Sequence, residues 1–457
     1  MNRAWLYAAV AGTAGLLVLD STSTAVNLGL LTLAYAGFAG VLVIQLRDPW
    51  LDRRTLLRVV AWLLVIAVVV PPLESRDVWA YAMYGRILGV HHASPYTTLP
   101  AAFATDPFLA QMDPQWHHTA SVYGPLFASI SAAGSAVAGN SLLLARLFFQ
   151  SLAAASVVGI LFVLDRRKAG VAALVCIGLN PIILVSVVNS GHNDALVGLA
   201  LLGGVVLAVD RRPALAGAAF AAAVLVKLAV VLAVAAAVLW VWRRQGLRAC
   251  LATSWVFVVL VLGSLVLFGG NDALAPLQHA QLRQTASSIW IEPREALIDQ
   301  KVDDGVAPGL AEEQARDRIA MLAQLAVGVA CVAVVLRRWR EPELPVVVGA
   351  VLLTFAVVGA NFLPWYWAWG LPVLALVVRS RLMWVALVQG ALLELALFPV
   401  AVGADGLSPL EHLQVWTRDV ALPVFEVAVL IGLVLYRPRR RGSEQAAAAD
   451  TSPALVA

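Results

Sequence analysis

Residues 56–81 read LLRVVAWLLVIAVVVPPLESRDVWAY, an apolar run that gives way to two prolines and the polar group Glu74-Ser75-Arg76-Asp77. A helix needs about 20 mostly apolar residues to cross the hydrocarbon core of a bilayer. The change in character therefore predicts a helix over about 56–73 that ends at a membrane face, with Asp77 just beyond it. The polar interval continues to residue 124, and ionisable groups in such a place are candidates for function.

Similar apolar runs recur along the 457 residues, of which 61% are hydrophobic and only 13% are charged. Soluble proteins carry about 25% charged residues. The composition therefore excludes an ordinary soluble domain and predicts an all-α polytopic membrane protein, because helices satisfy their own backbone groups in lipid. The net charge of +4 calls for no nucleic-acid partner, since the basic residues are placed by topology.

The basic clusters predict the topology, because Lys and Arg concentrate in cytoplasmic turns. They lie near residues 3, 47–58, 166–168, 211–212, 243–248, 337–340, 379–381 and 437–441. Placing them all inside gives a multi-pass plasma-membrane protein with about 12–14 spans and both termini cytoplasmic. The expected helices are 4–20, 25–46, 56–73, 141–165, 169–188, 193–209, 213–226, 228–242, 249–268, 319–336, 344–360, 365–379, 382–402 and 419–436.

This path leaves two long segments, 74–122 and 269–318, on the outer face. The apolar stretch 123–139 cannot be a full crossing without moving the 166–168 cluster outside, so we expect a helix lying along or dipping into the membrane surface. We expect residues 1–441 to form one integral-membrane domain. The Ala- and Ser-containing residues 442–457 are expected to be a disordered cytoplasmic tail.

Asp77 is the first candidate for a catalytic residue. Helical spacing from Asp77 places Tyr81 and Tyr84 on its face, and a partly desolvated carboxylate is a candidate general base. The alternative is an aspartate that caps the helix N-terminus. Tyr96 and Tyr123 stand in Pro- and Gly-containing turns of the same segment, where their phenols are candidates for lining a cleft.

Lys227 lies deep in an apolar stretch, and two short helices that meet near it fit 213–242 better than one span. A lysine at membrane depth costs about 2.5–3.5 kcal/mol, so we expect an anionic partner, for which the phosphate of a lipid-linked ligand is suitable. Snorkelling of the ammonium group is the alternative. His192, in the break between two apolar helices, is a second candidate for donating a hydrogen bond to such a phosphate.

Other polar and aromatic residues on this face have two interpretations. Asn193 and Asp194 serve either as a helix N-cap or as part of a cleft. Trp365 and Tyr366 belong either to an interfacial aromatic belt or to a groove for a sugar or lipid. The paired histidines at 91–92 and 117–118 match no zinc spacing, so we expect no metal and no cofactor.

Seven short motifs occur in an order that resembles actinobacterial polyprenol-phosphate-mannose-dependent α-(1→6)-mannosyltransferases, which are GT-C-fold enzymes related to glycosyltransferase family 87. The resemblance covers roughly residues 75–437. The motifs are Ser75-Arg76-Asp77 with Tyr81, Ser94-Pro95-Tyr96, Tyr123-Gly124-Pro125, Leu179-Asn180-Pro181, Gly191-His192-Asn193, Val226-Lys227 and Leu363-Pro364-Trp365-Tyr366.

The resemblance implies that the first outer segment, carrying membrane-surface helices, roofs an outward-facing cavity. It also implies that Asp77 is the catalytic base. We therefore expect an inverting transferase that moves a sugar, mannose in the first instance, from a polyprenyl-phosphate donor to a cell-envelope glycan or glycolipid on the outer face. Lys227 and His192, with Arg76 as a helper, would bind the donor phosphate. The alternatives are a polyprenyl-phosphate-arabinose-dependent transferase and a lipid or solute transporter.

Overall fold

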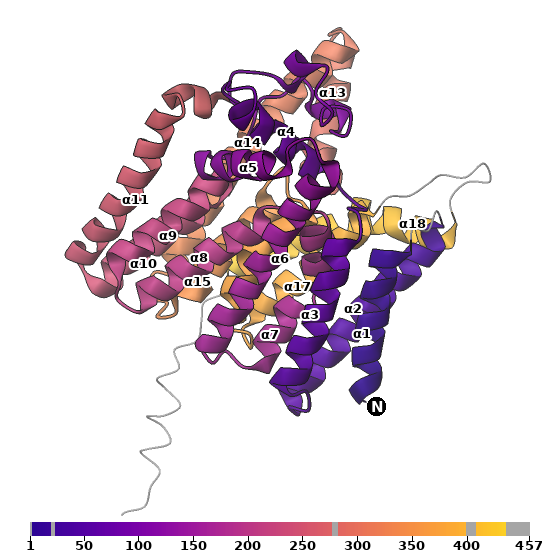
Figure 1. Cartoon of the computed structure of the whole chain (residues 1–457), viewed down its shortest axis with the longest axis vertical. Helices are drawn as coiled ribbons and strands as arrows, with labels where there is room; N and C mark the ends of the chain where they lie inside the picture. Colours follow the sequence, from indigo (N-terminus) through magenta and orange to yellow (C-terminus); the bar gives the residue numbers. More distant parts are fainter. Residues whose placement is uncertain (1, 20–22, 277–281, 399–407, 436–457) are drawn as a thin grey trace, which may run out of the picture.

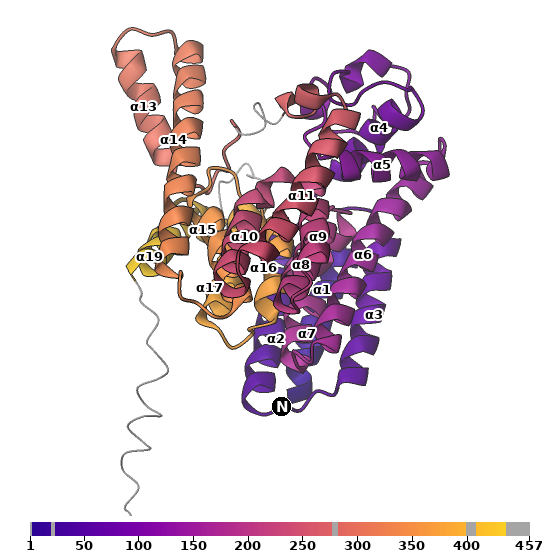
Figure 2. The ribbon, with the colours of Figure 1, turned by 90° about the vertical axis from the view of Figure 1, so that its left-hand side faces the viewer.

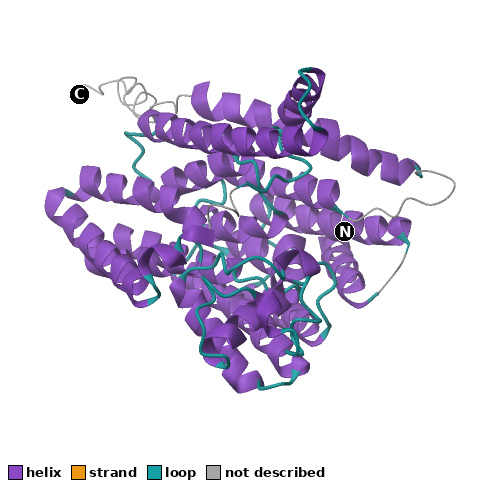
Figure 3. Cartoon of the chain, turned by 90° about the horizontal axis from the view of Figure 1, so that it is seen from above, coloured by secondary structure: helices purple, strands orange, loops and turns teal. Residues whose placement is uncertain are grey.

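The computed structural model of the chain describes residues 2–19, 23–276, 282–398 and 408–435, and these residues form helices and loops without a strand (Figure 3). The all-α polytopic fold predicted from composition is confirmed. The expected tail at 442–457 lies outside the described residues, as do residues 403–407 of a third, smaller outer loop expected at 403–418.

The first half of the chain ends with α9, and its buried residues share one apolar core with those of the second half. Its helices are α1 (Asn2–Val18), α2 (Thr24–Arg47), α3 (Arg53–Val69), α4 (Asp77–Gly89), η1 (Pro100–Phe103), η2 (Pro114–Trp116), α5 (Pro125–Ala138), α6 (Leu142–Arg166), α7 (Val171–Gly178), η3 (Ile182–Asn189), α8 (Asp194–Val209) and α9 (Pro213–Val226).

The second half begins at the break after α9. Its helices are η4 (Leu228–Val230), α10 (Val231–Gln245), α11 (Leu247–Leu267), η5 (Gly270–Ala273), α13 (Ile291–Asp303), α14 (Pro308–Arg337), α15 (Leu344–Val358), η6 (Pro364–Tyr366), α16 (Trp367–Ala375), α17 (Arg381–Leu397), α18 (Pro409–Trp416), η7 (Thr417–Ala421) and α19 (Leu422–Leu435).

Five of the described helices are long and apolar enough to cross a membrane, or six if α7 and η3, bent by 47°, count as one span. Four more apolar helices, α5, α8, α9 and α15, have only 10–17 residues. Fewer helices therefore reach full spanning length than the 12–14 spans of the expected path, because several expected spans are short or broken. Such breaks are tolerated in membrane proteins where neighbouring protein satisfies the freed backbone groups.

Two breaks illustrate this. The expected pair of helices around Lys227 is confirmed: α9 ends at Val226, and Lys227 is extended with φ −151° and ψ 115°. The break between α7 and η3 differs from the single helix expected over 169–188. It falls at Asn180-Pro181, where proline removes a backbone donor and the Asn180 side chain accepts a hydrogen bond from the Ile182 amide at 3.1 Å.

Helices α4, α5 and α13 lie at one end of the bundle, and the N-terminus lies at the other (Figures 1 and 2). In both views α5 runs across the direction of α6, as expected for the stretch 123–139. The segment 269–318, expected to be a loop, is largely helical: α13 and the start of α14 project from the bundle in Figure 2. Residues 308–318 offer Pro at the first helical position and several strong helix formers, which explains the earlier start of α14.

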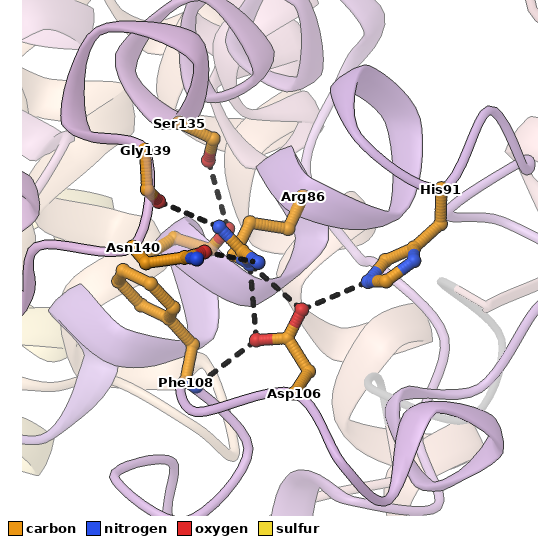
Figure 4. Close-up of polar contacts among 8 residues, drawn as sticks. Arg86, His91, Asp106, Phe108, Ser135, Gly139 and Asn140 are labelled. Carbon is orange, nitrogen blue, oxygen red and sulfur yellow. Dashed lines mark hydrogen bonds and ion pairs between the residues drawn. The ribbon is translucent and has the colours of Figure 1, made fainter.

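The loop between α4 and α5 is fixed by a buried ion pair (Figure 4). The Arg86 Nε atom lies 2.7 Å from an Asp106 oxygen, and His91 Nε2 lies 2.8 Å from the same oxygen. Arg86 also donates to the Gly139 carbonyl and the Asn140 side chain. Burial opposes ionisation of Asp106, but hydrogen bonds from Arg86, the Phe108 amide and His91 outweigh it and lower the Asp106 pKa. The clamp joins the end of α4 to the middle of this loop and to the turn that follows α5.

Candidate active site

A cavity of about 610 Å³ opens between the α4–α5 loop, the break at Lys227, and the segments before α13 and α16. Acidic, cationic and aromatic side chains all reach it, which is unusual at the end of an apolar bundle. Its lining residues include Asp77, Trp116, Tyr123, Lys227, Arg283, Arg294, Arg316, Asn361, Trp365 and Tyr366.

Asp77 occupies the first turn of α4, and Arg76 takes the N-cap position. Asp77 is therefore not the N-cap residue of α4, which was the alternative interpretation. The Asp77 side chain is 21% exposed, and the α4 N-terminus favours a negative charge there. Burial nevertheless raises its pKa to about 6, against the lowering effect of Lys227. A carboxylate with this pKa is a base at neutral pH and can hold a proton in mild acid.

Lys227 has the anionic partner expected from its depth, but this partner is a carboxylate of the protein itself and not only a ligand phosphate. Its Nζ lies 2.8 Å from Oδ1 of Asp194, a carboxylate with no exposed side-chain surface. Trp369 Nε1 donates to the same oxygen at 2.6 Å. The ammonium also lies over the Tyr366 ring, 4.2 Å from its centroid. The extended backbone at Lys227 thus directs its ammonium group, which is paired with Asp194, toward the cavity. The Lys227 side chain is 15% exposed.

His192 lies behind the cavity rather than on its wall. Its ring stacks on Trp365 with centroids 4.2 Å apart, and its Nδ1 lies 3.2 Å from the Tyr81 hydroxyl. The same nitrogen is 3.8 Å from carboxylate oxygens of both Asp77 and Asp194. His192 therefore stands between the two acids and orders the aromatic ring that lines the cavity.

The remaining predicted residues divide into two groups. Tyr123 reaches the cavity and packs edge-on against Tyr81, with ring centroids 4.9 Å apart. The hydroxyls of Tyr84 and Tyr96 instead donate to the carbonyls of Thr119 and Tyr123, at 2.8 and 3.0 Å. These two phenols hold the loop in place and do not line the cavity.

Three further predicted residues lie off the cavity wall. Asn193 is buried at the N-cap of α8 without a side-chain capping hydrogen bond, and Asp194 begins that helix beneath Lys227. Arg76 is exposed and is not part of the lining.

Sequence reasoning missed three arginines that line the cavity, Arg283, Arg294 and Arg316. They belong to the segment 269–318, which the basic clusters predict to lie on the outer face. Arginines there run against the usual cytoplasmic bias, and that departure was the signal that could have found them. Arg283 also stacks over the Trp116 ring at 3.7 Å and donates to the Gln115 side chain at 3.3 Å. It therefore ties this segment to the α4–α5 loop across the cavity.

Fold and site together define a polytopic membrane protein whose bundle carries a carboxylate and several cations around one cavity. The family model described as "Alpha-(1->6)-mannopyranosyltransferase, N-terminal domain" matches residues 3–244. The match covers more than half of the chain, and the protein belongs to this family. The family recognised from the sequence motifs is thereby confirmed.

Two curated relatives illustrate the similarity. Alpha-(1->6)-mannopyranosyltransferase A of Mycobacterium tuberculosis is 23% identical over 457 residues, which covers 96% of this chain and 85% of the relative. Its counterpart of the same name in Corynebacterium glutamicum is 32% identical over 171 residues, or 36% of this chain and 34% of the relative. No solved structure matches the chain significantly.

Proposed function

We propose that this protein is an inverting mannosyltransferase of the membrane, with a polyprenyl-phosphate-mannose donor and a cell-envelope glycan or glycolipid acceptor. The extracytoplasmic face is the proposed side of the reaction. The observation that carries the proposal is the shared cavity: Asp77, Lys227 and three arginines are all among its lining residues. Family membership supports mannose as the sugar.

Asp77 is the proposed general base. It takes the proton from an acceptor hydroxyl as the hydroxyl oxygen forms a bond to the anomeric carbon of the donor. The bond between that carbon and the phosphate oxygen breaks, and the bonding electrons leave with the phosphate. One displacement of this kind inverts the anomeric centre, so an α-linked product requires a β-linked donor. Base catalysis of this type contributes about 10²–10⁴-fold in rate.

The cationic residues would bind the phosphate and stabilise the charge that grows on it, which is a large catalytic term in sites shielded from water. Lys227 supplies a point charge at the cavity floor, held by Asp194. Arg283, Arg294 and Arg316 supply planar donors suited to phosphate oxygens. His192 Nε2 is buried without a hydrogen-bond partner among the described residues, so it would reach a phosphate once Trp365 moves. Arg76, beside Asp77 in the chain, remains the proposed helper.

The aromatic residues at the cavity suit a sugar, because flat rings pack against the apolar face of a hexose. Trp365, Tyr366, Tyr123 and Trp116 all line the space. The polyprenyl chain would then lie among the apolar helices, with its phosphate at Lys227.

The test is transfer of label by the purified full chain from polyprenyl-phosphate-mannose and, in parallel, from polyprenyl-phosphate-arabinose, with envelope glycolipids as acceptors. We expect labelled mannose in the acceptor and none from the arabinose donor. Transfer from the arabinose donor alone would replace the proposed donor. Donor translocation across liposomes without any transfer would contradict the enzyme assignment.

A further inference from the structure

A second cavity, of about 940 Å³, lies at the opposite end of the bundle from Asp77. Ala169, in the turn between α6 and α7, is part of its wall, and this turn is at the lower end in Figure 1. The other walls come from α15, the end of α16, α17 and α19. Helix α15, about 22 Å long at 1.5 Å per residue, separates this cavity from the candidate active site.

The interior of this second cavity is apolar and elongated. Its walls include Val346 and Leu353 of α15, Val385 of α17, and Phe425 and Val429 of α19. The lining of α15 runs from residue 343 to residue 353, a depth of roughly 15 Å along the helix. A space of this length and lining suits acyl chains better than a compact polar metabolite.

The mouth of the same cavity is cationic. Arg338, Arg379 and Arg381 line it together with Ser380, and Glu343 is the single acid among the lining residues. Arg379 is oriented by a hydrogen bond to the Leu46 carbonyl at 3.0 Å. Guanidinium groups bind phosphate oxygens in pairs, and basic pockets between membrane helices bind anionic head groups.

Helix α19 provides an open side to the cavity. Ala428 and Gly432 both line it and are exposed, and a methyl group added at Gly432 would meet no atom within 4 Å. Ala428 and Gly432 therefore leave a side of the cavity through which an occupant from outside the bundle can enter.

We propose that this second cavity binds an anionic phospholipid of the surrounding leaflet. The phosphate lies at Arg338, Arg379 and Arg381, and an acyl chain lies between α15, α17 and α19. The lipid is not a reactant, because the cavity is at the far end of the bundle from Asp77. It fills space between helices that the described residues leave open.

The test uses the delipidated full chain and native mass spectrometry with phosphatidylglycerol or phosphatidylcholine of matched acyl chains. We expect tight binding of one phosphatidylglycerol and weaker binding of phosphatidylcholine. Replacing both Arg379 and Arg381 by Gln should weaken the phosphatidylglycerol affinity roughly 30-fold. The matched control is Arg244→Gln, an exposed arginine in the last turn of α10 that does not line the cavity.

Gly432→Leu should fill the cavity and abolish binding. Gly263→Leu, the same change on α11, is the control, because a side chain there also meets open space. Retained mannosyl transfer shows that each variant is folded. Equal binding of the two lipids to the wild type, or unchanged binding in Gly432→Leu, would overturn the proposal. If Gly432→Leu does not fold, unchanged phosphatidylglycerol affinity in the double arginine variant would overturn it.

Discussion

The ion pair between Lys227 and Asp194 gives the sharpest energetic prediction. Asp194 is fully buried and accepts from Lys227 at 2.8 Å and from Trp369 at 2.6 Å. Replacing Lys227 by Met would leave the Asp194 carboxylate buried, with the indole N–H of Trp369 as its remaining hydrogen-bond donor among the described side chains. Replacing Asp194 by Asn would keep an acceptor for Trp369 but leave the ammonium without its counter-charge.

Removing one partner of a buried ion pair costs about 3–5 kcal/mol, because the other charge stays desolvated and uncompensated. Lys227 is slightly exposed, which places Asp194→Asn toward the lower end of that range and Lys227→Met toward the upper end. The double variant removes both charges, so its loss should be well below the sum of the single losses. A coupling free energy of about 2–3 kcal/mol is therefore expected.

The assay is a double-mutant cycle on the free energy of unfolding, measured by reversible denaturation in mixed micelles. Arg167 and Asp210 form an exposed pair at 2.8 Å, and the same cycle there should give a coupling below about 1 kcal/mol. Strictly additive losses at Lys227 and Asp194 would refute the reasoning, as would a coupling no larger than that of the exposed pair.

Three further predictions concern the cavity and its cover. Since the Asp77 pKa is raised to about 6, transfer should fall as the pH drops below 6. The raised pKa also means that the native state gains stability as the pH falls from 6 toward 4. Asp77→Asn should therefore be up to about 3 kcal/mol more stable than the wild type at pH 7. Equal stability of the two proteins at pH 7 would contradict this. Arg283→Ala should reduce kcat/KM for the donor about 10- to 100-fold. The control is Arg318→Ala, because Arg318 is exposed and does not line the cavity. A wild-type kcat/KM in Arg283→Ala would show that Arg283 is not part of the site. Asp106→Asn should destabilise the protein by about 3–5 kcal/mol and speed hydrogen exchange across 91–122, whereas unchanged exchange would show that the Arg86 clamp does not fix the loop.

Much of the fold could be read from the sequence, because apolar run length and basic clusters reflect the cost of polar groups in lipid. The break at Lys227 was readable for the same reason. The helical segment 291–318 was not, since its polar residues look like a loop when hydrophobicity is the guide. The bend at Asn180-Pro181 lies within a long, mostly apolar run, and the length of that run alone does not show it.

The site was predictable to the extent that it follows from local sequence. Asp77 and Lys227 stand out against apolar neighbours, and the structure places both on one cavity. The pairing of Lys227 with Asp194 joins residues 33 positions apart, and the sequence has no register that brings them together. Tyr84 and Tyr96 show the converse. Their residue type suggested that they line a cleft, but both hydroxyls donate hydrogen bonds to backbone carbonyls within the fold.

The central claim is that Asp77 acts as the base in mannosyl transfer. Its most direct test is single-turnover transfer of labelled mannose by wild type, Asp77→Asn and the control Asp303→Asn, an exposed aspartate at the end of α13. All three should bind the polyprenyl-phosphate-mannose donor with similar affinity. The account predicts normal transfer by the control and a loss of at least about 10²-fold in Asp77→Asn. Transfer by Asp77→Asn at the wild-type rate would contradict it.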